Sequence, residues 1–501
     1  MNKYNHLKTL SRDIRVLRGI HSLLDWDQET YMPSAGTEIR AEQFKVLAGV
    51  IHKAKTGPAF TKALGALVNL KNGHTLDKKL PGDKQAALRE WYRDYRIAKA
   101  LPKKFVQDWA ELTSKAMHVW RQARQENNFE QFAPSLKKIV DMARKKAEYL
   151  GYDEHPYDAL LDHYEEGATT KEISPLFKQL RTFITKVLKE LARKKVDDSF
   201  LFGNFPEEKQ IAFGHLILKT IDYDSTRGRL DLSAHPFSAA THPTDSRITT
   251  RILPSALMSN ISAVLHEAGH GFYEMGLPIE EYGTPLGDAL SLGMHESQSR
   301  WWETRIGLST AFWSYFFPLL QKHFKGKFDH ISLKQFCQAI NKVEPSYIRV
   351  EADEVTYGLH VILRYELELA LIEGKLNVKE LPEAWNAKMQ ELLGITPPTL
   401  TEGCLQDIHW SMGAIGYFPT YTLGNLYCAH LFKTFENTHK EWKKRVGKGE
   451  FLFVKDWLRE NIHRHGQCYT SKELLKRVTG NPFSAQAYID YLNEKYLKGT
   501  S

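Results

Sequence analysis

The sequence predicts a mostly α-helical fold with one small β-sheet. Through most of the chain, apolar residues recur at the spacing of one helix face, as in Leu359, Ile362, Leu363 and Leu367. Alternation with a period of two is rare, and its main occurrence lies between about residues 231 and 252, where Thr, Ile and Leu gather around prolines. Because no internal repeat, low-complexity linker or abrupt change of composition interrupts the chain, we expect residues 1–501 to form a single large domain.

The composition excludes several broad classes of protein. With 42% apolar and 26% charged residues, the chain has the material of a folded soluble protein. No uncharged apolar run approaches the roughly 18 residues that span a bilayer, and the first residues contain no apolar secretion segment, so we expect a cytoplasmic protein with no membrane partner. The net charge of +8 comes from short basic clusters between acidic residues, which indicates solvated helix faces and no nucleic-acid partner.

Neither the cysteines nor the Gly- and Lys-rich stretch 55–84 indicates chemistry. The four cysteines are scattered without C-x-x-C spacing, so we expect buried, reduced thiols and neither a disulfide framework nor a thiolate metal site. The stretch 55–84 is expected to form a mobile surface connection.

The clearest functional signal is a His-Glu-x-x-His pattern at residues 266–270. It lies in a helix that we expect over about residues 255–276, beginning after Pro254-Ser255. Residues four apart share one helix face, so the imidazoles of His266 and His270 can reach the same metal ion. Glu267 projects beside that face, where its carboxylate can accept a proton from a water molecule that the ion activates.

A third ligand must come from elsewhere in the chain, and Glu296 is the best candidate. It lies in a second helix, expected over about residues 291–306, after the turn-rich segment 283–287. A carboxylate oxygen would complete a His/His/Glu set and leave a fourth position for water. His295 is the alternative ligand, but it points about 100° of helical turn away from Glu296, so we expect one of the two to bind.

The competing interpretation is that the pattern is accidental and that His266 and His270 are structural histidines. With 21 His in 501 residues, such a pattern arises by chance in roughly one such chain in twenty. The helical setting and the downstream Glu favour a metal site.

Several segments spread over nearly the whole chain resemble the carboxypeptidase Taq family of metallocarboxypeptidases. They are Trp26-Asp27-Gln28-Glu29-Thr30-Tyr31-Met32-Pro33, Pro156-Tyr157-Asp158-Ala159-Leu160-Leu161-Asp162, His235-Pro236-Phe237, Asp245-Ser246-Arg247-Ile248-Thr249, the metal pattern 266–270, His295-Glu296-Ser297-Gln298, Ile348-Arg349-Val350-Glu351-Ala352-Asp353 and Gly403-Cys404-Leu405-Gln406-Asp407-Ile408-His409-Trp410.

The resemblance implies a helical fold with a deep central groove, a small sheet beside the active site, and a homodimer. It also implies one divalent ion per chain, zinc or alternatively cobalt, bound by His266, His270 and Glu296, with Glu267 as general base. Two departures stand out. Glu166 and Ala168 replace the Pro and Met common in the family, and Arg300 stands where some zinc peptidases place an acid that orients a histidine. Glu303 is a candidate substitute for that acid.

Further residues are candidates for contact with the substrate. Tyr417, Tyr421 and His409 are candidate donors to the oxyanion, although tyrosines so placed are often groove wall. The resemblance favours Arg349, with Arg247 second, for binding a free carboxylate through two parallel hydrogen bonds.

Either arginine could instead belong to a structural ion pair. His235 is placed at the same end of the groove, and Asp353 and Asp407 are expected to orient neighbouring side chains.

Together these features predict a metal-dependent carboxypeptidase that removes single residues from peptides with a free C-terminus. An endopeptidase or dipeptidase with the same metal chemistry is the nearest alternative, because the metal site itself does not define which bond is cut. A helical peptide-binding protein without metal or catalysis is the alternative from another class.

Overall fold

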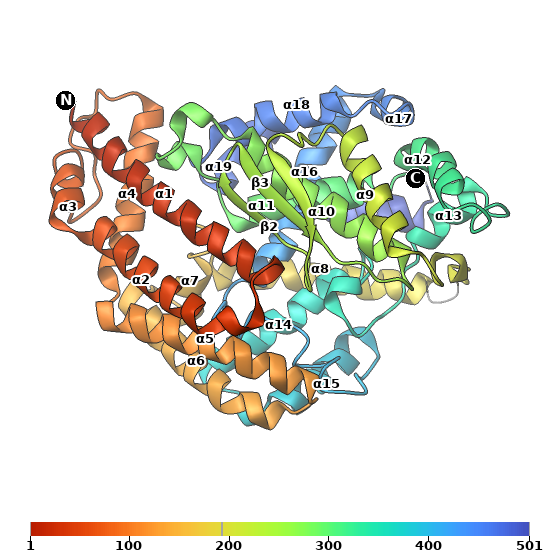
Figure 1. Ribbon diagram of the computed structural model, residues 1–501, viewed down its shortest axis with the longest axis horizontal. Helices are drawn as coiled ribbons and strands as arrows, with labels where there is room; N and C mark the ends of the chain where they lie inside the picture. Colours follow the sequence, from red (N-terminus) through yellow and green to blue (C-terminus); the bar gives the residue numbers. More distant parts are fainter. Residues whose placement is uncertain (1, 192–193, 500–501) are drawn as a thin grey trace.

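Helices form most of the molecule, as the spacing of apolar residues predicts (Figure 1). The computed structural model describes residues 2–191 and 194–499. The α-helices in the first half of the chain are α1 (Lys3–Thr30), α2 (Thr37–Thr56), α3 (Pro58–Gly65), α4 (Gly82–Ala100), α5 (Lys103–Gln125), α6 (Phe129–Leu150), α7 (Pro156–Leu161), α8 (Thr170–Leu191) and α9 (Glu207–Thr220). Those in the second half are α10 (Leu257–Gly276), α11 (Leu292–Arg300), α12 (Thr310–His323), α13 (Leu333–Ile340), α14 (Tyr357–Glu373), α15 (Leu381–Leu393), α16 (Pro419–Thr438), α17 (Trp442–Val446), α18 (Leu452–Asn461), α19 (Ser471–Thr479) and α20 (Gln486–Leu492).

A three-stranded sheet lies near the centre of the molecule (Figure 1). It is formed by residues 228–250, close to the range of about 231–252 that the sequence predicts. Its strands are β1 (Gly228–Leu232), β2 (Ser238–His242) and β3 (Asp245–Thr250), in the order β1-β3-β2. The central strand β3 pairs parallel to β1 and antiparallel to β2. Helix α10 packs against β3, and α1 packs against β2. The sheet therefore joins the N-terminal arm, which consists of α1 to α4, to the helix that contains the His-Glu-x-x-His pattern.

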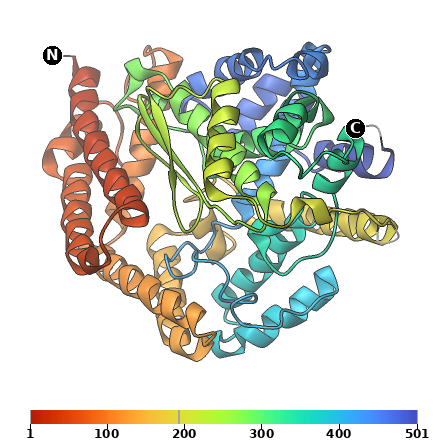
Figure 2. The same ribbon diagram turned by 45° about the vertical axis from the view of Figure 1, so that its right-hand side comes forward.

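Buried apolar side chains form two clusters. The larger one extends from α5 to the C-terminal helices and surrounds α10, α11 and α16. The smaller one joins α1, α3 and α4 and includes Leu286 from the segment between α10 and α11. The N-terminal helices therefore stand as a separate arm at one side of the molecule, which Figure 2 shows from a second direction. That residues 1–501 act as one domain stays a prediction.

The stretch 55–84 is more ordered than its composition suggests. It contains α3, whose side chains Phe60 and Leu64 are buried, and a β-bridge between Val68 and Thr75. The expectation of a mobile connection is therefore wrong for residues 58–65. Pro58 at the first helical position is the signal that should have indicated this helix.

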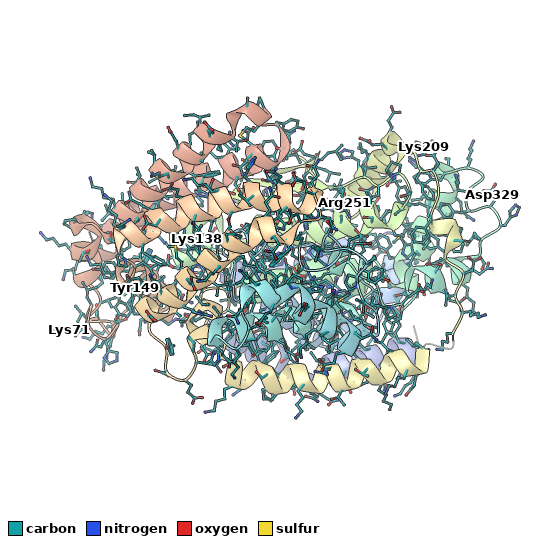
Figure 3. All side chains as sticks on the ribbon, turned by 90° about the horizontal axis from the view of Figure 1, so that it is seen from below. Lys71, Lys138, Tyr149, Lys209, Arg251 and Asp329 are labelled. Carbon is teal, nitrogen blue, oxygen red and sulfur yellow. The ribbon has the colours of Figure 1, made fainter. Side chains whose placement is uncertain are left out.

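The surface seen in Figure 3 presents basic side chains on separate elements. Lys71 precedes α4, Lys138 lies on α6 and Lys209 lies on α9, and all three are exposed. No helix among the described residues is both long and apolar enough to cross a bilayer. The absence of a nucleic-acid partner stays a prediction.

Candidate metal centre

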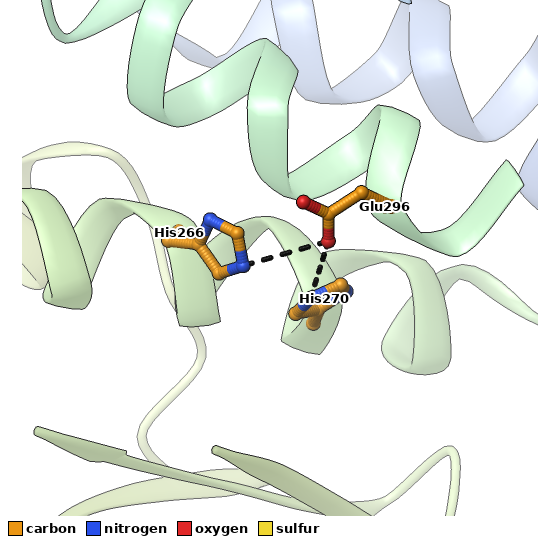
Figure 4. A group of neighbouring side chains, drawn as sticks. All are labelled: His266, His270 and Glu296. Atoms are coloured by element: carbon orange, nitrogen blue, oxygen red, sulfur yellow. Dashed lines mark ion pairs between the residues drawn. The ribbon is translucent and has the colours of Figure 1, made fainter. Parts of the chain in front are cut away.

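Helices α10 and α11 bring His266, His270 and Glu296 together (Figure 4). The Nε2 atoms of His266 and His270 lie 3.6 Å and 3.5 Å from Glu296 Oε2. One ligand atom from each of the three residues lies within 4.8 Å of the other two. Two imidazole nitrogens and a carboxylate oxygen at this separation suit a divalent metal ion, and catalytic metal sites commonly use three such protein ligands and keep one position open.

Two glycines set the position of the helix that contains Glu296. A Cβ on Gly269 of α10 would lie 2.4 Å from the carbonyl oxygen of Gln298, and one on Gly424 of α16 would lie 2.6 Å from Glu296 Cβ. No side chain fits at either position, so α11 is held between α10 and α16 at nearly backbone contact. This close approach places Glu296 beside two imidazoles on a neighbouring helix.

The carboxylate of Glu296 is buried and incompletely paired. The residue is 4% exposed, its Oε2 accepts a hydrogen bond from the Ser299 hydroxyl at 3.0 Å, and its Oε1 has no hydrogen-bond partner. Burial acts to raise the pKa of this carboxyl, but His266, His270 and Arg300 outweigh burial and lower it to about 2. A buried anion with a free oxygen fits a divalent cation, because such charges are normally paired or bound to metal.

The two imidazoles differ in their electrostatic setting. Burial acts to lower the pKa of His266, but Glu296 and Glu303 outweigh it and raise the pKa to about 9. Burial lowers the pKa of His270 to about 4. A cation must therefore displace a proton from His266, whereas His270 is already neutral near pH 7.

Glu267 lies beside the cluster and has no fixed partner at one oxygen. It is 5% exposed, and its Oε2 has no hydrogen-bond partner. Burial raises its pKa to about 7. A carboxyl with that pKa can both accept and release a proton near neutral pH, which is what a general base and acid must do.

Residues behind the ligands hold their rings in place. The carboxylate of Glu303, in the π-helical turn Trp301–Ile306, lies 2.7 Å from His266 Nδ1 and accepts a hydrogen bond from Arg300 at 2.8 Å. Glu303 thus occupies the position that the sequence suggests for a substitute acid, and Arg300 supports it. His295 lies outside the three-residue cluster, with its Nδ1 2.6 Å from His270 Nδ1.

His409, Tyr417 and Tyr421 come together beside the cluster. The His409 Nε2 and the Tyr421 hydroxyl are 2.9 Å apart, and the rings of His409 and Tyr417 lie 5.2 Å apart. Burial raises the pKa of Tyr417 to about 12, and Glu296 and Glu267 add to the shift, so this phenol faces the acidic side of the site and stays protonated. Pro419 begins α16, so Tyr421 is helical and Tyr417 precedes the helix.

Arg349 is buried in a pair of arginines that share one carboxylate. Its Nε and Nη2 donate to Asp407 Oδ1 at 3.0 Å and 2.9 Å, and its Nη1 donates to the Tyr357 hydroxyl at 3.0 Å. Arg364 donates to the other oxygen of Asp407 at 2.6 Å. Two guanidinium groups and one carboxylate leave one positive charge in excess. Tyr421 lies against this charge, because Arg349 stacks over its ring at 4.7 Å.

Arg247 and His235 lie at the sheet. Arg247 on β3 pairs with Asp245 at 2.8 Å and stacks over the Trp26 ring of α1 at 4.4 Å. His235 is exposed on the loop between β1 and β2, and its Nδ1 lies 3.0 Å from the Pro236 carbonyl oxygen. Arg247 is thus half-buried under the N-terminal arm, unlike Arg349.

Sequence reasoning missed several residues that surround the site. Tyr357 lies between two cations, since Arg300 stacks over its ring at 4.9 Å while Arg349 binds its hydroxyl. Arg364 and Glu274 were also missed. For Glu274 the sequence offers a weak signal of proximity to the site, because this residue follows His270 by four positions on the same helix face.

Known proteins match the chain over nearly its whole length. The family model of carboxypeptidase Taq (M32) metallopeptidases matches residues 6–496. Thermostable carboxypeptidase 1 of Thermus thermophilus is 41% identical, with 98% of each chain covered. Carboxypeptidase 1 of Bacillus subtilis is 37% identical, with 95% of this chain and 94% of the relative covered.

Solved structures of carboxypeptidases have the same fold as this chain. A crystal structure of an M32 carboxypeptidase from Deinococcus radiodurans superposes with a TM-score of 0.94 at 34% identity over 99% of each chain. A Pyrococcus furiosus carboxypeptidase gives a TM-score of 0.92 at 36% identity, again over 99% of each. The chain therefore belongs to the carboxypeptidase Taq (M32) family of metallopeptidases.

Proposed function

We propose that this protein is a metallocarboxypeptidase that removes single residues from peptide C-termini with one zinc ion held by His266, His270 and Glu296. The observation that supports this most directly is the cluster itself, in which three ligand atoms lie within 4.8 Å of one another beside the unpartnered Oε2 of Glu267. Peptides with a free C-terminus are the substrates that this function requires.

When bound, the ion would lower the pKa of a water molecule toward about 7 and polarise the scissile carbonyl. Glu267 takes the proton from the attacking water and then passes it to the leaving amine, because its buried carboxyl can exist in both protonation states near neutral pH. Tyr421 and Tyr417 are protonated phenols beside the cluster and can donate to the developing oxyanion. His409 orients the Tyr421 hydroxyl through the 2.9 Å contact between them.

Recognition of the free carboxylate falls to the buried arginine pair. The excess positive charge of Arg349 and Arg364 over Asp407 is suited to a second carboxylate. Of the two arginines, Arg349 is the better candidate for binding the substrate carboxylate, because its guanidinium stacks on Tyr421, a proposed donor to the oxyanion. Arg247 is the second candidate, with His235 at the same end of a central groove.

A panel of matched peptides tests the whole proposal. The full chain is treated with a chelator, restored with Zn²⁺ or Co²⁺, and assayed on peptides that differ only in a free or amidated C-terminus. Chelation should abolish cleavage, metal should restore it, and only free C-termini should be trimmed, one residue at a time. Equal cleavage of amidated peptides would favour an endopeptidase, and activity that survives complete metal removal would exclude the metal mechanism.

We further propose that the protein acts as a cytoplasmic homodimer. The cysteines of the described residues are free thiols, which suits a reducing compartment. Exposed apolar side chains recur at helical spacing on α1 (Val16, Ile20 and Leu23) and on α2 (Ile39, Val46 and Val50), which suits self-association. Sedimentation of wild-type protein and a Val46→Asp variant tests this, and a wild-type monomer at micromolar concentration would contradict it.

A further inference from the structure

His295 contacts the ring nitrogen of the proposed ligand His270 that does not face Glu296. Its Nδ1 lies 2.6 Å from His270 Nδ1, and its Nε2 lies 2.9 Å from Glu274 Oε1. His270 meanwhile turns its other nitrogen, Nε2, toward Glu296 Oε2 at 3.5 Å. Glu274, His295 and His270 therefore form one unbroken row of polar contacts that ends at the metal cluster.

Both helices of the site build this row. Glu274 and His270 lie one turn apart on α10, and His295 reaches between them from α11. The side chains of Glu274 and His295 are 16% and 15% exposed. The ring of Tyr273 packs on His295 with the centroids 5.0 Å apart, which helps to fix the plane of the imidazole. The row is thus largely shielded from water and held between α10 and α11.

Hydrogen-bond rules leave one proton arrangement when His270 binds a cation. The ligating Nε2 must offer a lone pair, so the ring proton of His270 lies on Nδ1. This N–H donates to His295 Nδ1, which must then be an unprotonated acceptor. His295 accordingly has its proton on Nε2, where it donates to the carboxylate of Glu274. The opposite arrangement would place a proton on His270 Nε2 and block the cation.

We propose that Glu274 and His295 are positioning residues that hold His270 in the tautomer able to ligate a divalent cation. This inference rests on the proposed function, since it requires a cation at the cluster. His266 reaches an anion without an intermediate, because its Nδ1 lies 2.7 Å from Glu303 Oε2. The two histidine ligands are therefore supported by different routes, one through a carboxylate directly and one through a neutral imidazole.

Zn²⁺ affinity of the full-length protein, measured by competition with a chelator, tests the role of His295. His295→Leu removes the acceptor and should weaken Zn²⁺ binding by about 10–100-fold. His295→Asn keeps an oxygen near the position of Nδ1 and should restore affinity to within about threefold of wild type. Glu274→Gln should fall between the two. His430→Leu is the matched control, because His430 is a 7% exposed histidine on α16 whose ring bonds the Ser484 carbonyl, and it should leave affinity unchanged.

A second measurement reads the proton positions in the wild-type protein directly. In zinc-loaded wild-type protein labelled with ¹⁵N-histidine, the His295 signals, assigned by their loss in His295→Asn, should report a neutral ring protonated at Nε2. A doubly protonated His295, or a His295→Leu variant that binds Zn²⁺ as tightly as wild type, would overturn the inference. Failure of the wild-type protein to bind Zn²⁺ would instead overturn the proposed function.

Discussion

Glu296 and Glu354 are two buried glutamates whose carboxyl groups have the same low pKa for different purposes. They are 4% and 3% exposed, and cationic neighbours outweigh burial to bring each pKa to about 2. Both oxygens of Glu354 accept hydrogen bonds from fixed donors, one on Oε1 and three on Oε2. These are Arg305 at 3.2 Å, Lys495 at 2.8 Å, Tyr491 at 3.0 Å and Tyr496 at 3.0 Å.

Glu296 has a much poorer set of contacts. Its neighbouring imidazoles are 3.5 Å and 3.6 Å away, beyond a good hydrogen bond, and its Oε1 has no partner. Glu354 therefore stabilises the C-terminal helices, whereas Glu296 keeps an oxygen free, as the proposed metal site requires. Burial and a depressed pKa do not distinguish a structural carboxylate from a ligand, but the presence of a donor at each oxygen does.

The largest expected effect concerns Glu267, the proposed general base. Glu267→Gln should lower kcat/KM on a free peptide by roughly 10²–10⁴-fold, because the general base is lost while the ligands remain. Metal content and thermal stability should stay close to wild type. Glu280→Gln, at an exposed glutamate, is the control and should have full activity. Normal turnover in Glu267→Gln would assign the proton transfer to another group.

The same substitution at the two compared glutamates should give opposite results. Glu354→Gln should lower the free energy of unfolding by roughly 3–5 kcal/mol, since it leaves Arg305 and Lys495 buried without their anion, and Zn²⁺ affinity of the folded protein should not change. Glu296→Gln should abolish tight Zn²⁺ binding with a smaller change in stability of the metal-free protein. Urea unfolding and chelator competition measure both quantities, and parallel losses in the two variants would remove the distinction.

Acid should remove the contribution of Glu354 in a defined window. Its folded pKa of about 2 lies below its ordinary value of 4.5, so the stabilisation is complete above about pH 4.5 and is lost as the pH falls toward about 2. In that window, Glu354→Gln should show a pH slope of unfolding free energy shallower than wild type by up to about 1.4 kcal/mol per pH unit. Equal slopes would show that Glu354 keeps an ordinary pKa.

The smallest effect tests how α11 is held. Gly269→Ala forces a Cβ against the Gln298 carbonyl and should cost about 1–3 kcal/mol of stability and weaken Zn²⁺ binding, because Glu296 moves with its helix. Gly49→Ala is the matched control in α2, where an added Cβ meets nothing within 4 Å. It should instead stabilise the protein by about 0.5–1 kcal/mol. Unchanged metal affinity in Gly269→Ala would mean that the helix spacing is adjustable.

The sequence was most informative where geometry is local. A helix places residues four apart on one face wherever it occurs, so the proximity of His266 and His270 could be predicted without any tertiary structure. The sequence also offered Glu303 as a candidate acid that orients a histidine, but only the structure identifies that histidine as His266. The same helical periodicity predicted the mostly α fold, and the cluster of Thr, Ile and Leu predicted the sheet.

Contacts between distant segments could not be predicted in this way. His295 was considered as a ligand because it adjoins Glu296, but its actual partner depends on the spacing of α10 and α11, which Gly269 determines. Likewise, Arg305 and Lys495 meet Glu354 from elements far apart in sequence, and no periodic pattern reports that meeting. The wrong expectation of a mobile connection at residues 58–65 has a different origin. The Gly and Lys residues around α3 gave the stretch the composition of a loop, although it contains a short amphipathic helix.

The contact between the N-terminal arm and the sheet has a consequence for the order of folding. The Tyr31 hydroxyl donates to Asp231 at 2.7 Å across 200 residues of sequence, and Trp26 meets Arg247 in the same region. At roughly 5–20 residues per second, a ribosome needs about 10–40 s to make the intervening chain. During that interval α1 has no strand to dock on, so the first helix synthesised cannot reach its native place until about half of the chain has been made.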